Sequence, residues 1–336
     1  MQIEHGGALD RAIARFGGEY GSWIDLSTGI NPEVFPLPSI GSEIWNRLPD
    51  EKLQASALQA AREYYCATPE AGIVAAPGTQ ALIQAMPDLI AKGEVAIIRP
   101  TYQEHERSFL LAGWTVSNCQ TVDAIPVSAK VAVVVNPNNP DGRIVAKDTL
   151  LELAESMARK GGFLIVDEAF ADPHPEVSVA AHAGMDGLVV LKSFGKFFGL
   201  GGLRLGFALS TPAVSRALAL RLGLWAVSGP ALAIAIHAFS DKERLSAYVQ
   251  RLKNRRTLLG KVLSGAGLSE VGGTMLFSLV EHGKATMLHE ELCKGYVLTR
   301  KFGYAPRWLR FGLPLDQDDA SRLQHRLGIA TGAVSS

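Results

Sequence analysis

The stretch LKSFGKFFGLGGLRLGFALS, residues 191–210, places Lys196 and Arg204 among small and aromatic residues, directly after an apolar run typical of a strand. A lysine that is desolvated among phenylalanines and glycines loses affinity for its proton, and a neutral amine is a nucleophile toward aldehydes. Arg204 and Ser193 would suit a phosphate, because they offer a guanidinium fork and a hydroxyl donor. The stretch therefore indicates a site for a phosphorylated aldehyde; the alternative is a surface lysine on a loop.

Apolar runs rich in β-branched residues lie on both sides of this stretch and predict strands. They cover residues 95–98, 130–136, 162–170, 187–193 and 204–210. Helical periodicity separates several of them, over residues 79–92, 103–111 and 147–160. Such alternation is typical of an α/β fold, with a mostly parallel central sheet and helices on both faces.

The pattern changes after about Pro230, where a second, smaller α+β domain is expected. A long charged helix is predicted over residues 241–263, with short strands near 274–280 and 308–313 and a last helix over 316–327. We therefore predict three parts: an N-terminal segment, 1–35, that joins the small domain and the substrate pocket; a large domain, 36–235; and a small C-terminal domain, 236–336.

Composition narrows the classes of partner. The 33 basic and 33 acidic residues give zero formal net charge, so neither nucleic acid nor an anionic membrane surface is an expected partner. The most apolar stretch, 222–236, is too short to cross a bilayer and suits a buried helix pair. The N-terminus lacks the pattern of a secretory signal, which makes the cytoplasm the expected location. The three cysteines have no metal-site spacing, and no metal is expected.

Polar residues that follow apolar strands are the next candidates, since ligands of open α/β sheets bind at the carboxyl ends of the strands. In AAPGTQALI (75–83) a Pro-Gly turn opens a helix, with Thr79 as its expected N-cap, and free N–H groups there would hold an anion. VVVNPNNPDG (133–142) runs into a rigid turn that can aim an asparagine. FLIVDEAF (163–170) buries Asp167, which then needs a partner. Ordinary caps, turns and solvated strand ends remain the alternatives.

In this order the four motifs resemble the pyridoxal-phosphate enzymes of fold type I, the aspartate aminotransferase superfamily, over most of the chain. The resemblance implies pyridoxal 5'-phosphate as cofactor, with Lys196 bound to its aldehyde, Asp167 on its ring nitrogen and Asn139 at its phenolic oxygen. Tyr102 would stack on the ring. The same resemblance assigns the phosphate cup to Gly78, Thr79, Gln80, Ser193 and Arg204. An ionised Asp167 would keep the ring nitrogen protonated, so that the ring accepts electrons.

Two departures favour a narrower group within that superfamily. Phe170 stands where many members have tyrosine, and residues 47–50, Arg-Leu-Pro-Asp, stand where many have Tyr-Pro-Asp. The chain resembles the threonine-phosphate decarboxylases of cobalamin biosynthesis in EHGGALDRA (4–12), DLSTGINP (25–32), PTYQEHERS (100–108) and DEAFAD (167–172). That resemblance implies decarboxylation of L-threonine O-3-phosphate to (R)-1-amino-2-propanol O-2-phosphate.

The same resemblance points to the substrate pocket. It places His5 and Asn31 toward the substrate's phosphate, while Arg300 and Arg310 would divide phosphate and carboxylate in a way that the sequence does not fix. It also implies a homodimer that acts on a small phosphorylated amino acid. A histidinol-phosphate aminotransferase is the first alternative, because it shares fold, cofactor and a phosphorylated substrate. The second is an inactive regulator or binding protein of the same fold, against which the intact motif residues count.

Overall fold

The computed structural model describes residues 5–335 and divides them into two compact units. One unit comprises Val34–Asn139 and Arg143–Ser246. The other combines the described chain before Val34, the short segment Pro140–Gly142 and the chain from Ala247 onward. The first of these units holds the central sheet.

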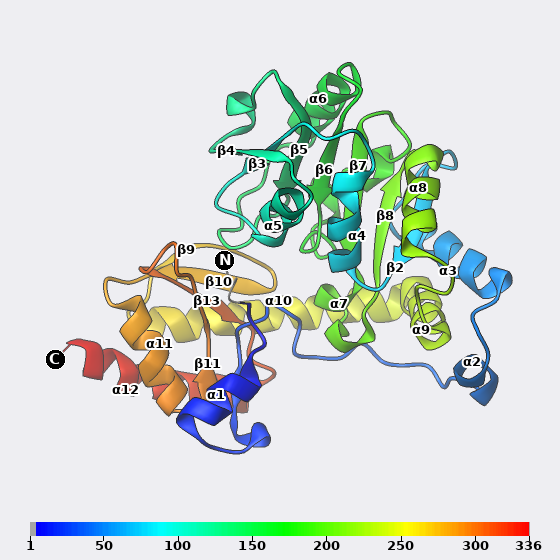
Figure 1. Ribbon diagram of the computed structural model, residues 1–336. Coiled ribbons are helices and arrows are strands. Elements are labelled where there is room, and N and C mark those ends of the chain that lie inside the picture. Colours follow the sequence, from blue (N-terminus) through cyan, green and yellow to red (C-terminus); the bar gives the residue numbers. More distant parts are fainter. Residues whose placement is uncertain (1–4, 336) are drawn as a thin grey trace. The chain divides into compact units, whose positions relative to one another are not determined.

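The central sheet has seven strands (Figure 1). Their spatial order is β2 (Gly72–Ala76), β8 (Gly206–Ser210), β7 (Leu188–Ser193), β6 (Phe163–Asp167), β5 (Ala129–Val135), β3 (Glu94–Ile98) and β4 (Thr115–Cys119). β8 runs antiparallel to both of its neighbours and the other pairs are parallel. Every residue of β6 and β7 is buried, as expected for strands covered on both faces. The prediction of an α/β fold with a mostly parallel sheet is confirmed.

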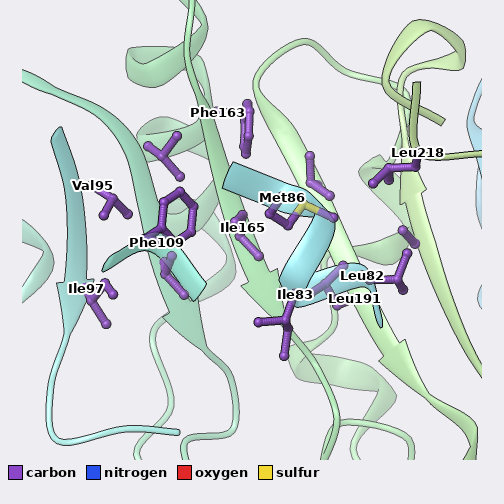
Figure 2. Close-up of a cluster of buried hydrophobic side chains, with 14 of the residues drawn as sticks. Leu82, Ile83, Met86, Val95, Ile97, Phe109, Phe163, Ile165, Leu191 and Leu218 are labelled. Atoms are coloured by element: carbon purple, nitrogen blue, oxygen red, sulfur yellow. The ribbon is translucent and has the colours of Figure 1, made fainter. Parts of the chain in front are cut away.

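One face of the sheet is covered by α4 (Thr79–Ala85), α5 (Glu104–Leu111) and α8 (Pro212–Leu222). Figure 2 shows this core, in which Leu82 and Ile83 of α4 belong to the same buried cluster as Ile165 of β6 and Leu191 of β7. Phe109 of α5 fills the space beside them. Burial of these large apolar side chains supplies most of the driving force that holds the helices on the strands.

The opposite face carries a second, aromatic core. Tyr65 directly follows α3 (Glu51–Tyr64), and its ring lies 6.3 Å from that of Phe207 in β8 and 5.4 Å from that of Phe239 in α9 (Gly229–Ser240). Because side chains alternate along a strand, Phe207 faces this side, while its neighbour Ala208 belongs to the first core. The remaining helices of this unit are α2 (Ser42–Asn46), α6 (Lys147–Ala158) and the single turn α7 (Phe194–Phe197).

The other unit is built on a four-stranded antiparallel sheet. Its order is β12 (Arg300–Lys301), β13 (Trp308–Gly312), β10 (Phe277–Glu281) and β9 (Glu270–Thr274). The N-terminal segment joins this unit through a separate two-stranded sheet, in which β1 (Ile24–Asp25) pairs in parallel with β11 (Val297–Leu298). The helices are α1 (Leu9–Phe16), α10 (Lys242–Gly265), α11 (Ala285–Lys294) and α12 (Gln317–Ser335), of which α10 begins in the first unit.

Several local expectations differ from the structure. Thr79 does not cap α4; Gly78 holds the N-cap position, with a positive φ of 82° that suits glycine. α4 ends at Ala85 instead of continuing to residue 92, because Pro87 cannot donate to a fourth preceding carbonyl. The expected strand at 274–280 is the turn and second half of the β9–β10 hairpin. Within residues 5–335 no helix is long and apolar enough to span a membrane.

Candidate active site

The carboxyl ends of β6 and β7 bring Asp167 and Ser193 to one face of the central sheet. In the parallel register Asp167 pairs with Leu191, and Ser193 lies two residues beyond Leu191, so the three side chains share a face. Asp167 is 3% exposed and Ser193 8% exposed. The position agrees with the general rule that ligands bind beyond the carboxyl ends of parallel strands.

Asp167 has a histidine partner that the sequence reasoning missed. His105 Nε2 lies 2.8 Å from Asp167 Oδ2, and the His105 side chain is fully buried. The Ala169 N–H donates to the other carboxylate oxygen at 3.1 Å. Among the described residues His105 Nδ1 has no hydrogen-bond partner. Because an ionised carboxylate only accepts hydrogen bonds, Nε2 of His105 is the donor in this contact.

A signal for His105 was present in the sequence. It follows Tyr102 by three residues at the start of a predicted helix, and that spacing puts two side chains on one helix face. In the structure the two rings meet edge to face with centroids 6.2 Å apart. The Tyr102 hydroxyl donates to Gln80 Oε1 at 3.3 Å, and Gln80 Nε2 donates to Glu104 at 2.9 Å. Tyr102 is thus fixed beside the partner of Asp167.

The predicted phosphate cup lies where α4 begins, against the end of β8. A methyl group at Gly78 would stand 2.9 Å from a guanidinium nitrogen of Arg204, and one at Gly206 would stand 2.7 Å from the Thr79 amide nitrogen. Arg204 adopts a left-handed backbone with φ 55°, and its Nη1 donates to the Gly201 carbonyl at 3.2 Å. Glycine at residue 78 therefore leaves room for the Arg204 guanidinium, and glycine at residue 206 lets the start of α4 approach the first residue of β8.

Lys196 lies in the one-turn helix α7, on the only part of 191–198 that is not fully buried. Phe194, Phe197 and Phe198 are buried and pack into the aromatic core. The Lys196 ammonium lies 5.7 Å from the centre of the Phe170 ring. Phe170, where many family members have tyrosine, is thus an apolar neighbour of the candidate nucleophile.

Asparagines 136, 138 and 139 follow β5, and two of them serve the turn itself. Asn136 exchanges hydrogen bonds with Val145, and Asn138 accepts from Thr101 at 2.7 Å and donates to the Pro100 carbonyl at 2.8 Å. Asn139 is more exposed than either, in the turn that follows. Of the three asparagines only Asn139 is not buried, and its place at the phenolic oxygen of the cofactor stays a prediction.

The four predicted substrate residues belong to the other unit, and two of them share a pocket. His5 and Arg300 line a cavity of about 170 Å³ whose wall also includes Arg11, Arg15 and Lys301. Arg15 is already paired with Glu290 at 2.9 Å. The pocket combines several cations with the exposed His5 imidazole, and such a lining favours an anionic group.

Arg310 lies in β13 opposite Arg300 of β12, but it is buried. Burial in the first place, and then the nearby Arg300 charge, lower the pKa of Arg310 from its usual value to about 9. Its guanidinium donates to the Ser27 carbonyl at 2.7 Å and lies 4.8 Å from the centre of the Phe277 ring. A buried guanidinium that is shielded from water gains more free energy from a carboxylate partner than an exposed one does.

Three further residues each have a local hydrogen-bond or ion-pair partner. Asn31 is 1% exposed, and its side chain accepts from the Glu33 N–H at 3.3 Å, so it does not line the pocket of His5 and Arg300. Arg307 pairs with Glu281 on the surface at 2.8 Å. Asp50, in the departing Arg-Leu-Pro-Asp segment, caps α3 by accepting from the Leu53 N–H at 2.7 Å.

Comparison with known proteins explains this arrangement. The family model of aminotransferase class I and II matches residues 40–327. The chain belongs to this family. It is 46% identical to a threonine-phosphate decarboxylase from Sinorhizobium sp. and 40% identical to one from Pseudomonas aeruginosa, in both cases over 97% of each chain. Its fold is that of a histidinol-phosphate aminotransferase from Sinorhizobium meliloti solved with pyridoxal-5'-phosphate, with a TM-score of 0.82, 19% identity and coverage of 99% and 96% of the two chains.

Membership of this enzyme family confirms the prediction of pyridoxal 5'-phosphate as cofactor. The residues of the first unit fit that group. A buried carboxylate suits a protonated ring nitrogen, and the glycine-lined approach of Arg204 to the start of α4 suits a phosphate ester. Among residues 5–335 no group of three or more His, Cys, Asp or Glu side chains is arranged to hold a metal ion.

Proposed function

We propose that this protein decarboxylates L-threonine O-3-phosphate to (R)-1-amino-2-propanol O-2-phosphate in the biosynthesis of cobalamin. The observation that supports the proposal most strongly is 46% identity over 97% of the chain to a threonine-phosphate decarboxylase. The cationic pocket of His5 and Arg300 agrees with a substrate that carries a phosphate. The buried Arg310 agrees with a substrate that also carries a carboxylate.

Pyridoxal phosphate, when bound, accepts the electrons of a bond that breaks at the substrate's Cα. The residues of the chain decide where it sits and which bond breaks. Asp167, held by His105, would keep a proton on the ring nitrogen, and Asn139 would donate to the phenolic oxygen. Lys196 would hold the cofactor through its aldehyde. Gly78, Thr79, Gln80, Ser193 and Arg204 would hold the phosphate, with Tyr102 against the ring.

Decarboxylation requires that the bond from Cα to the carboxylate, and not another Cα bond, stands perpendicular to the cofactor ring, where it breaks most easily. Two anchors on the substrate, one for its phosphate and one for its carboxylate, would hold that orientation. We assign the substrate phosphate to the pocket of His5 and Arg300, since these side chains meet in one cavity. We assign the carboxylate to Arg310, whose burial makes a single close ion pair worth more than it would be in water. Asn31 does not line this pocket, and we leave it out of the phosphate anchor.

A histidinol-phosphate aminotransferase differs in the chemistry of its substrate, which has no carboxylate. Fold does not separate the two activities, because the solved aminotransferase from Sinorhizobium meliloti has the same fold at 19% identity. The aminotransferase would also need a 2-oxo acid to complete its cycle. Two products therefore distinguish the activities: CO2 and glutamate.

The test is to incubate the holoenzyme with threonine phosphate and, separately, with histidinol phosphate plus 2-oxoglutarate. We expect CO2 from the first mixture and no glutamate from the second. Glutamate from histidinol phosphate without CO2 from threonine phosphate would contradict the proposal. A protein that binds the cofactor and yields neither product would instead support an inactive regulator.

Substitution of the phosphate anchor should change substrate binding more than turnover. For His5→Ala we expect KM for threonine phosphate to rise about tenfold, the loss expected of one charge-assisted hydrogen bond, with kcat within a few-fold. Arg307→Ala is the matched control, because that arginine pairs with Glu281 on the surface. Equal KM values for His5→Ala and wild type would remove His5 from the pocket.

We also infer that the protein is a cytoplasmic homodimer. Exposed large apolar side chains support an interface on the first unit, where Trp45 of α2 is 67% exposed and Trp225 is 57% exposed. α2 contacts α9, which begins four residues after Trp225, so the two aromatics belong to neighbouring segments. Sedimentation equilibrium should give the mass of two chains, whereas the mass of one chain at micromolar concentration would refute the dimer.

A further inference from the structure

A buried ionic cluster lies behind the strand ends that carry Asp167 and Ser193. It consists of Glu168, Lys192 and Asp172, and we call these three residues the rear cluster. Lys192 Nζ lies 2.5 Å from Glu168 Oε2 and 3.8 Å from Asp172 Oδ1, and all three side chains are at most 2% exposed. Burial of ion pairs costs solvation that apolar residues would not lose. A contribution to folding stability therefore does not explain why these three charged residues are buried together.

Its position relative to the candidate active site follows from strand alternation. Glu168 follows Asp167, and Lys192 precedes Ser193, so each member of the pair points to the face opposite its neighbour. The Glu168 N–H donates to the Leu191 carbonyl at 2.9 Å, which extends the β6–β7 ladder by one step. The Glu168–Lys192 ion pair thus joins the two strands at the point where both deliver a residue to the cofactor.

Glu168 also fixes the loop that faces Lys196. Its Oε1 accepts the Val179 N–H at 2.7 Å, and its Oε2 accepts the Ser178 hydroxyl at 2.5 Å. These bonds close the loop of residues 169–177, which includes Phe170. The Phe170 ring lies 5.7 Å from the Lys196 ammonium. One buried carboxylate therefore holds both ends of the segment that carries the apolar neighbour of Lys196.

The charges of the rear cluster balance only if one carboxyl is neutral. Burial raises the pKa of Asp172 to about 7; Lys192 lowers that pKa, and Glu168 raises it. Besides these two charges, Tyr64 and Tyr65 face Asp172, and both keep their protons because burial raises their pKa values. Neither oxygen of Asp172 has a hydrogen-bond partner among the described residues. Glu168 accepts from three donors, which stabilise its negative charge. Asp172 is therefore the carboxyl that keeps its proton.

We propose that Glu168 and Lys192 are positioning residues for the cofactor site, which set Asp167, Ser193 and Phe170 through the ends of β6 and β7. Asp172 can ionise and serve as the counterion of Lys192 when Glu168 is neutral. The ion pair does not touch the cofactor face, and its action passes through the backbone of residues 167–168 and 192–193 and through the loop 169–177. This role rests on the pyridoxal-phosphate site proposed above, and it is independent of which substrate that site takes.

The first test is Lys192→Met, which keeps the length of the side chain and removes the charge. Without its partner, buried Glu168 must turn away or take up a proton, and the two strand ends shift. We expect cofactor affinity, measured by titration of the apoprotein with pyridoxal phosphate, to fall about tenfold, as for other supporting residues of a site. We expect kcat to fall about 10- to 100-fold, as for a misplacement of about 1 Å.

A spectroscopic measurement separates positioning from loss of stability. The absorbance of the bound cofactor is followed against pH, and its midpoint should move in Lys192→Met because Phe170 and Asp167 have moved. Val190→Ala is the matched control: Val190 lies on β7, two residues before Lys192 on the same face, and is fully buried. It should lower the melting temperature and leave the midpoint unchanged. A folded Lys192→Met with wild-type affinity and midpoint would overturn the proposal.

Paired substitutions keep the test decisive if Lys192→Met folds poorly. In Lys192→Met/Glu168→Gln no charge is left unpaired, so at least part of the lost affinity should return. Glu168→Gln alone should be mild, since Asp172 can ionise in its place, whereas Glu168→Gln/Asp172→Asn should lose more affinity than the two single variants together. Additive losses, or no recovery in the first double variant, would contradict a shared charge balance.

The proton that Asp172 keeps in the folded protein predicts a pH dependence of stability. The folded protein holds this proton up to a pH of about 7, whereas the unfolded chain releases it near its usual pKa of 3.8. The melting temperature should therefore decline as pH rises from about 4 to about 7 and then level off. In Asp172→Asn this part of the decline should vanish. An identical pH profile for wild type and Asp172→Asn would show that Asp172 is ionised throughout.

Failure of this proposal can be told apart from failure of the proposed function. Cofactor titration and absorbance need no substrate, so they test the rear cluster even if the wild type releases no CO2 from threonine phosphate. Conversely, wild-type CO2 release with unchanged cofactor properties in Lys192→Met would retain the proposed function and reject the positioning role.

Discussion

Lys196→Ala should release CO2 from threonine phosphate at least ~10³-fold more slowly than the wild type. Lys196 is the lysine of α7 that stands half-exposed beside the Phe170 ring, and it alone in this turn offers an amine to the aldehyde of the cofactor. Alanine keeps the helical turn, because it has the highest helix propensity, so the loss would be one of chemistry. The measurement is initial CO2 release at saturating substrate and cofactor.

A chemical label provides the control for this prediction. Borohydride reduction of the wild-type holoenzyme should add the cofactor's mass to the peptide that contains Lys196, and the label should disappear in Lys196→Ala. Lys160→Ala, at an exposed position after α6, should keep both activity and label. Label on another lysine, including the buried Lys192 four residues earlier, would show that the site has been assigned wrongly.

Asp167→Asn should reduce CO2 release by about 10²- to 10⁴-fold, the usual contribution of a positioned acid or base. The substitution preserves the shape of the side chain and removes its negative charge, so it can no longer stabilise a proton on the ring nitrogen of the cofactor. The contact with His105 at 2.8 Å can persist, since an amide oxygen also accepts a hydrogen bond. We therefore expect a folded protein with near-normal melting behaviour and very low activity.

Two comparisons make that result specific to Asp167. Asp148→Asn, at an exposed position in the first turn of α6, should have wild-type activity. His105→Gln should fall between the two, because it retains a donor toward Asp167 but loses the rigid ring that meets Tyr102. An Asp167→Asn enzyme with activity within a few-fold of wild type would exclude a role for this carboxylate in catalysis.

The sequence predicted the central sheet because its strands are buried on both faces. Runs such as residues 130–136 and 187–193 consist mainly of β-branched and other apolar residues, and only a doubly covered strand tolerates that composition. The edges were harder to predict. β4 lies at the sheet's end and includes polar residues at Ser117 and Asn118, and β2 was interpreted only as the approach to a turn. Edge strands lack the continuous apolar pattern that identifies central ones.

Within residues 191–198 the sequence could identify Lys196 by its place in a known motif. It could not distinguish the role of Lys192, because both lysines lie in the same apolar surroundings along the chain. Tertiary structure decides this: strand alternation turns Lys192 to the rear face, where its Nζ lies 2.5 Å from Glu168, whereas Lys196 of α7 lies beside the Phe170 ring. The partner of Asp167 likewise depends on α5 packing against the sheet.

The sequence by itself predicted the fold class and the polar residues at the strand ends, because these follow from the local hydrophobic pattern, and it predicted the family through the resemblance of its motifs. Only the tertiary structure decided which polar residues meet. It paired His105 with Asp167 across 62 positions of sequence, gathered His5 and Arg300 around one pocket, and buried Arg310 away from solvent. Such contacts are non-local, and no pattern along the chain encodes the distance between two atoms that folding alone brings together.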